Sequence, residues 1–167
     1  MTIPHRPNLQ TVLTITFWGV ILVLTASSCG SARRLAEKNA KISKVVAASR
    51  GYLGTPYRYG GISKSGIDCS GLILQSYKTI NLDLPRSSAD QSETGKKVKI
   101  QQLRPGDLLF FAMGKRRRKI THVGMVTNVT KDKIMFIHAS TSAGVVERDL
   151  RQEYYMKHFR GARRIIL

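Results

Sequence analysis

The segment GIDCSGLILQSYKTI, residues 66–80, decides which kind of fold to expect. After Asp68 in the chain, apolar side chains recur at helical spacing: Leu72, Ile73, Tyr77 and Ile80. The spacing predicts an amphipathic helix with Cys69 in its first turn. The free N–H groups and the dipole of a helix N-terminus favour a thiolate, so we expect a lowered thiol pKa and donors able to hold an oxyanion. The alternative is a small, buried and unreactive Cys.

The segments around this helix predict an α+β domain. An earlier helix is expected from Ile42 to Leu53, where Gly54 and Pro56 stop it, and a loop follows over 55–66. A short helix begins at Ser87. Five short apolar runs then predict strands at 108–111, 123–127, 134–138, 144–147 and 164–167, with an amphipathic stretch at 150–158. We therefore expect N-terminal helices packed on a mostly antiparallel sheet.

Length and charge narrow the possible partners. The chain has 167 residues, which fits one ordinary domain with a short extension. It carries 28 Lys and Arg against 10 Asp and Glu, a formal net charge of +18. Such an excess predicts polyanionic partners: cell wall polymer, acidic lipid or nucleic acid.

The N-terminus has the layout of an export signal. An uncharged stretch from Val12 to Leu24 lies between Arg6 and a run of small residues. The segment LTASSCG, residues 24–30, resembles a bacterial lipoprotein signal, in which the Cys receives lipid. A stop-transfer anchor is the alternative for the apolar stretch.

This resemblance implies a signal peptide over residues 1–28 and lipid on Cys29. A small, polar and basic segment over 29–40 predicts a flexible tether, and residues 41–167 form the working domain. Lipidation would leave Cys69 as the single thiol of an exported protein. A disulfide between the two Cys residues is the alternative.

Two histidines supply partners for the thiol. His122 opens one predicted strand and His138 closes the next, so a hairpin would bring them together. A nucleophile needs a base within hydrogen-bond reach and a third group that orients the base. We expect His122 to act as the base and His138 as the orienting group.

The chain from Val45 onward resembles the NlpC/P60 cysteine peptidases, papain-like enzymes that hydrolyse murein stem peptides or their cross-links. The resemblance rests on motifs in the family's order: LGTPYRYGG (53–61), DCSG (68–71), LPRS (84–87), PGDL (105–108), HVG (122–124), HAS (138–140) and GARR (161–164). It is greatest to small lipoprotein murein endopeptidases of Gram-negative bacteria, which implies export and a lipid anchor in the outer membrane facing the periplasm.

The resemblance also implies roles for individual residues and no metal or other cofactor. Cys69 would be the nucleophile, His122 the base and His138 the third member of the triad. Four further residues would line the site: Tyr57, near the oxyanion, Asp68 and Ser70, beside the stem peptide, and Arg86, which either buttresses the site loop or contacts a carboxylate.

Three other readings stay open at this point. A zinc hydrolase needs Cys and His ligands, but the short local pairs typical of zinc sites do not occur. A basic cell-wall-binding protein would use the run from Lys115 to Lys119, which we otherwise expect in a hairpin loop. No aromatic residues interleave this run, so we expect no nucleic-acid partner. An acyltransferase or amidase on the same fold is the third.

Overall fold

The structure is a computed structural model that describes residues 9–114 and 119–167, with side chains described from residue 30 onward. The chain divides into two compact units, Met1–Asn39 and Ala40–Leu167, which we describe separately. In the part of the chain that the structure describes, no helix is both long and apolar enough to span a membrane. The Cys29 side chain and residues 115–118 of the basic run lie outside the described part.

Helix α1 (Leu9–Arg50) corrects the expectation of a flexible tether, because residues 30–40 are helical. The segment is rich in Ala, Arg, Leu, Glu and Lys, which are strong helix formers. Arg33 Nε also donates to Glu37 Oε1 at 3.0 Å, an i,i+4 ion pair that supports a helix. In the second unit the last turns of α1 bury Val45 and Val46, as the apolar spacing predicts.

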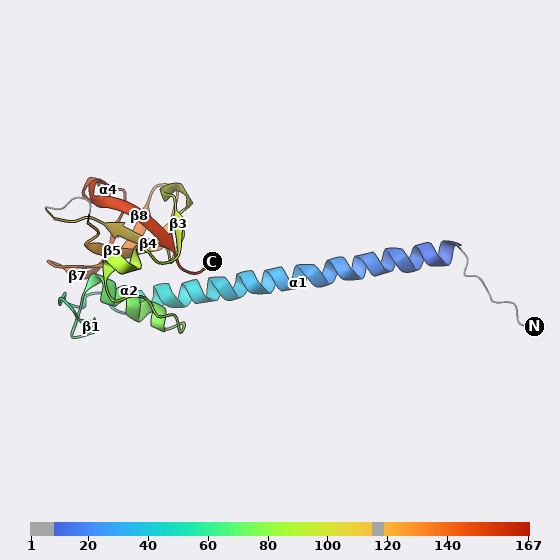
Figure 1. The fold of residues 1–167 in the computed structure, drawn as a ribbon, viewed down its shortest axis with the longest axis horizontal. Helices are drawn as coiled ribbons and strands as arrows, with labels where there is room; N and C mark the ends of the chain where they lie inside the picture. The colour runs from blue at the N-terminus through green and yellow to red at the C-terminus, as the bar shows by residue number, and fades with distance from the viewer. Residues whose placement is uncertain (1–8, 115–118) are drawn as a thin grey trace, which may run out of the picture. The chain divides into compact units, whose positions relative to one another are not determined.

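The second unit contains a six-stranded sheet in the order β3-β8-β4-β5-β6-β7, with every neighbouring pair antiparallel (Figure 1). The α+β class is thereby confirmed. The strands are β3 (Lys96–Val98), β4 (Leu108–Phe111), β5 (His122–Val129), β6 (Ile134–Ser140), β7 (Gly144–Asp149) and β8 (Phe159–Arg164). A two-stranded ribbon, β1 (Ile62–Ser63) and β2 (Gly66–Ile67), precedes them.

The last strand lies earlier in the chain than the sequence predicts. Its register pairs Gly161 with Phe110 and Ala162 with Leu109, so the small residues and not the apolar 165–167 join the sheet. Ile165 and Ile166 instead pack against the core beyond the strand end. Strand β3, with its lysines, was not predicted because its sequence lacks an apolar alternation.

Three short α-helices and one 3-10 turn complete the unit: α2 (Cys69–Lys78), α3 (Ser88–Gln91), η1 (Ile100–Gln102) and α4 (Glu153–His158). Helix α2 confirms the predicted helix. The Ser87 hydroxyl caps α3 by accepting from the Asp90 N–H at 3.1 Å, as its spacing predicts.

The core that positions the site lies between α2 and the sheet. Leu72 and Ile73 are fully buried in one apolar cluster with Val123 and Met125 of β5. Burying each such side chain contributes roughly 1.5–3 kcal/mol. The Tyr77 hydroxyl donates to the Gly106 carbonyl at 2.6 Å and ties the end of α2 to the turn before β4. The N-terminus of α2 is therefore held over β5, the strand that begins with His122.

Candidate active site

The first turn of α2 is fixed by Asp68, which caps the helix. Its Oδ1 accepts from the Gly71 N–H at 2.7 Å, and its Oδ2 accepts from the Gly60 N–H at 2.8 Å. Arg86 donates to both oxygens, at 2.9 Å from Nη1 and 2.6 Å from Nη2. Burial raises the pKa of Asp68, but these bonds outweigh it and hold the pKa below its usual value. Asp68 is therefore an ionised carboxylate.

Ser70 and Arg86 complete a closed polar cluster with Asp68. The Ser70 hydroxyl donates to Asp68 Oδ1 at 3.1 Å and accepts from Arg86 Nη1 at 2.9 Å. Of the two roles open to Arg86, the geometry supports the buttress, because its fork holds the carboxylate that caps α2. Its side chain is still 42% exposed and lines a hollow beside Cys69.

The Cys69 thiol is free and buried at the start of α2. Burial raises its pKa, and the Asp68 charge raises it further, while the N–H groups of Val123 and Ser70 lower it. The expected fall in pKa is therefore wrong. The main reason is that burial disfavours the thiolate, and the negative charge of the capping carboxylate adds to this effect. Cys69 rests as a neutral thiol.

The two predicted histidines meet across β5 and β6. His122 Nε2 and His138 Nδ1 lie 2.8 Å apart, with the rings nearly perpendicular at 89°. Burial lowers the pKa of His122 to about 4, and burial with the neighbouring His122 and Arg148 lowers that of His138 to about 3. Both rings are neutral at pH 7. The bond between them leaves His122 Nδ1 without a hydrogen-bond partner among the described residues.

Tyr155 extends this pair and was missed by the sequence analysis. Its hydroxyl oxygen lies 3.2 Å from His138 Nε2, and Phe136 stacks on the His138 ring at 5.1 Å between centroids. Burial raises the pKa of Tyr155, so the hydroxyl is neutral. The only sequence signal was its place in the amphipathic stretch, which is equally typical of a core aromatic residue.

Cys69 lines two adjoining hollows. One, of about 500 Å³, is lined by both histidines, Cys69 and Tyr57. The other, of about 440 Å³, is lined by Cys69, Tyr57, Tyr59 and the Asp68–Ser70–Arg86 cluster. The structure thus brings together all seven predicted site residues. Burial raises the pKa of the half-buried Tyr57, which leaves its hydroxyl a neutral donor. Within the described residues, no three His, Cys, Asp or Glu side chains are placed to hold a metal ion.

Comparison with known families decides the classification. Residues 54–164, well over half of the chain, match the NlpC/P60 family. This chain belongs to the NlpC/P60 family. The match covers every predicted site residue of the cysteine-histidine centre and ends at the last residue of β8.

Relatives and solved structures agree with this family assignment. The chain is 36% identical over 154 residues to the probable endopeptidase NlpC of Escherichia coli, covering 87% of this chain and 96% of that one. It is 38% identical over 125 residues to the E. coli murein DD-endopeptidase MepS/murein LD-carboxypeptidase, covering 74% of this chain and 63% of that one. An NlpC/P60 protein of Bacillus cereus superposes with a TM-score of 0.69 at 31% identity, over 75% of this chain and 40% of that one.

Proposed function

We propose that this chain is a peptidoglycan hydrolase that cleaves amide bonds of murein stem peptides or their cross-links with Cys69 as nucleophile. Family membership and the named murein peptidase relative support the reaction class. The observation that carries the proposal is the buried thiol in one cavity with a hydrogen-bonded pair of neutral imidazoles. A neutral imidazole is the form that accepts a proton.

In the proposed reaction, His122 Nδ1 takes the thiol proton as Cys69 Sγ attacks the carbonyl carbon of the amide. His122 then gives that proton to the leaving amine, and the C–N bond breaks to leave a thioester. Water attacks the thioester with His122 again as base, which frees the acid and restores the thiol. Because burial raises the thiol pKa and lowers the imidazole pKa, both groups are neutral before attack.

The negative oxygen of each tetrahedral intermediate needs donors. The first N–H groups of α2 lie beside the thiol, and the Tyr57 hydroxyl lines both hollows that share it. We assign the oxyanion to these donors, since fixed donors in a site shielded from water cost no reorganisation during reaction.

The hydrogen bonds of the histidine pair are compatible with His122 as the base. For His122 Nδ1 to accept a proton, its Nε2 must carry one and donate it to His138 Nδ1. His138 then carries its proton on Nε2 and donates to the Tyr155 oxygen. When Tyr155 accepts, the chain of bonds gives both rings the tautomer that the mechanism requires, whereas a Tyr155 hydroxyl that donated to His138 would place the His122 proton on Nδ1.

The substrate groove lies beside the capping cluster. Asp68 and Ser70 hydrogen-bond to each other and to Arg86, so we assign them the structural role of fixing the wall of the groove. The exposed Tyr59 ring and the exposed part of Arg86 remain to contact the peptide and its carboxylates.

Digestion of purified murein tests the proposal and fixes the bond. The full chain is incubated with murein, and released fragments are identified by mass. A relative named as a DD-endopeptidase favours cleavage of the cross-link between stems over the bond from D-glutamate to diaminopimelate. Intact murein after long digestion would contradict the proposal. Transfer of an acyl group in place of hydrolysis would establish the acyltransferase alternative.

Export and lipid attachment at Cys29 are a separate part of the proposal. An enzyme of murein acts outside the cytoplasmic membrane, and LTASSCG offers the Cys. An acylated Cys29 would gain roughly 0.8 kcal/mol per buried methylene, enough with several chains to hold the protein at a membrane. The mass of the N-terminal peptide from membrane-purified protein decides the matter: an unmodified Cys29 contradicts lipidation.

A further inference from the structure

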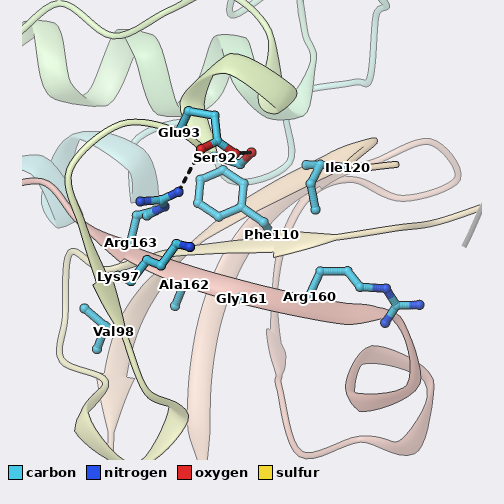
Figure 2. A pocket seen from close by; sticks show the side chains of 10 residues that line it. All are labelled: Ser92, Glu93, Lys97, Val98, Phe110, Ile120, Arg160, Gly161, Ala162 and Arg163. Carbon is cyan, nitrogen blue, oxygen red and sulfur yellow. Dashed lines mark hydrogen bonds and ion pairs between the residues drawn. The ribbon is translucent and has the colours of Figure 1, made fainter. Parts of the chain in front are cut away.

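A hollow of about 340 Å³ lies at the far end of α3 from the thiol. Ser88, which begins α3, lines the groove with Cys69, whereas Ser92, just after α3, lines this second hollow. Its volume falls within the range of small-molecule sites, roughly 300–1,000 Å³. We call it the edge pocket (Figure 2), and its lining is Ser92, Glu93, Lys97, Val98, Phe110, Ile120 and residues 160–163.

The apolar part of the edge pocket is formed by Ile120 and by the edge of Phe110, whose side chain is almost fully buried in the core. Figure 2 shows the Phe110 ring at its centre, with Ile120 beside it. The hollow exists because β8 carries Gly161 at the position paired with Phe110. A Cβ built at Gly161 meets no atom within 4 Å, so the strand leaves open space at Gly161.

Two cations stand opposite each other at one end of this pocket. Lys97 of β3 and Arg163 of β8 are register partners, and Figure 2 shows both on the same side of Phe110. Like charges directly opposite on neighbouring strands are destabilising, so this pairing needs an anion to offset it.

Glu93 is the acidic residue beside this pair, and it neutralises only one of the two positive charges. Arg163 Nη2 donates to Glu93 Oε2 at 3.0 Å, and the Glu93 side chain is 80% exposed. Lys97 has no hydrogen bond or ion pair with any described side chain. An exposed ion pair contributes little, so a ligand carboxylate can take the place of Glu93 while it also meets Lys97.

We propose that the edge pocket binds a carboxylate of a murein peptide next to the one being cut, with an aliphatic side chain of that peptide in the open space at Gly161. This inference rests on the proposed function for its substrate. Murein offers the matching chemistry, because its stem peptides combine free carboxylates with alanine methyl groups. Since α3 separates the edge pocket from the thiol, one neighbouring peptide is held while another is cleaved.

The test compares binding of full chains to murein in the Cys69→Ala background, which removes cleavage from the readout. Lys97→Gln is compared with Lys96→Gln, its neighbour on β3, which removes the same charge but does not line the edge pocket. We expect Lys97→Gln to weaken co-sedimentation with purified murein about threefold or more, and Lys96→Gln to change it less. Equal losses would overturn the proposal and leave general attraction between charges.

A second variant tests the cavity and not the charge. Gly161→Val fills the open space at Gly161 and keeps every cation, so it should lose binding as Lys97→Gln does. Normal binding by a folded Gly161→Val chain would overturn the cavity part of the proposal. Circular dichroism checks folding, and Lys97→Gln decides alone if this variant unfolds.

The ligand chemistry is tested with murein whose carboxylates have been amidated. The difference between Lys97→Gln and Lys96→Gln should vanish on this material; its persistence would rule out carboxylate recognition. Vesicles of phosphatidylglycerol form the other arm, and a Lys97-specific loss on vesicles but not on murein would make the ligand a membrane. The binding test does not depend on cleavage. If the wild-type chain leaves murein uncut, the proposed function is contradicted, but the binding test can still be carried out and interpreted.

Discussion

His122 Nε2 and His138 Nδ1 lie 2.8 Å apart, and the remaining nitrogen of each ring has a distinct setting: His138 Nε2 faces the Tyr155 oxygen, and His122 Nδ1 has no hydrogen-bond partner among the described residues. The arrangement makes the two histidines unequal. In the proposed reaction His122 exchanges a proton with Cys69, whereas His138 only orients His122.

Substitution of each histidine measures this inequality. His122→Ala should reduce the rate of murein cleavage by roughly 10²–10⁴-fold, the contribution of a positioned general base. His138→Gln should cost less, because a Gln carbonyl oxygen can still accept from His122 Nε2. Rates of fragment release for the two variants check the order. An active His122→Ala beside a dead His138→Gln would require the two roles to be exchanged.

Removal of the Tyr155 hydroxyl should release the tautomer of His138. Tyr155→Phe leaves the His138 Nε2–H without an acceptor, which costs about 1–3 kcal/mol of unfolding free energy and allows the other tautomer. Nitrogen chemical shifts of His138 report the tautomer directly, and urea unfolding reports the stability. Tyr154→Phe, at the exposed neighbouring ring, is the matched control. Identical His138 shifts in both variants would show that Tyr155 has no orienting role.

Stability should fall in mild acid because the two histidines are buried as neutral rings. Their pKa values are lowered in the folded chain from about 6.5 to about 4 for His122 and about 3 for His138. Between pH 6.5 and 4 the unfolded chain therefore binds more protons. The contribution is fully present above pH 6.5 and is lost as the pH falls toward 4, on the order of a few kcal/mol.

Urea unfolding at several pH values measures this loss. The decline should be shallower in His138→Gln, which has one ring fewer to protonate. An unfolding free energy that stays constant from pH 6.5 to 4 in the wild-type chain would contradict neutral burial of the pair.

The capping carboxylate should set the reactivity of the thiol. Asp68→Asn keeps a good N-cap side chain but removes the negative charge that raises the Cys69 pKa. We expect the midpoint of the pH dependence of iodoacetamide alkylation to move to lower pH. Asp90→Asn, in the first turn of α3, should leave it unchanged. An unmoved or higher midpoint in Asp68→Asn would show that the charge does not act on Cys69.

The sequence predicts the site better than it predicts its surroundings. Cys69 and the two histidines can be predicted because Cys and His are residue types that serve as nucleophile and base. Strong local patterns also place them at a helix start and on two adjacent strands. The sign of the Cys69 pKa shift was wrong, because burial and the Asp68 charge depend on tertiary packing. Tyr155 was missed for a similar reason: its partner is 17 residues away.

Local preferences also explain the errors outside the site. The polar composition of residues 30–40 predicts a tether, although Arg33 and Glu37 have the i,i+4 spacing of a helical ion pair. Strand β3 has lysines where alternation would be expected, and its pairing with β8 depends on residues more than 60 positions away. No local pattern reports such a partner.

The thiol mechanism is tested most directly by the rate at which the full chain releases fragments from purified murein after one cysteine is removed. Cys69→Ala and Cys69→Ser should each abolish release while circular dichroism shows an intact fold, because a serine hydroxyl in this setting lacks the acidity and nucleophilicity of a thiol. Cys29→Ser, the matched removal of the other cysteine, should keep the wild-type rate in detergent solution. Release of the same fragments by both Cys69 variants would contradict the account.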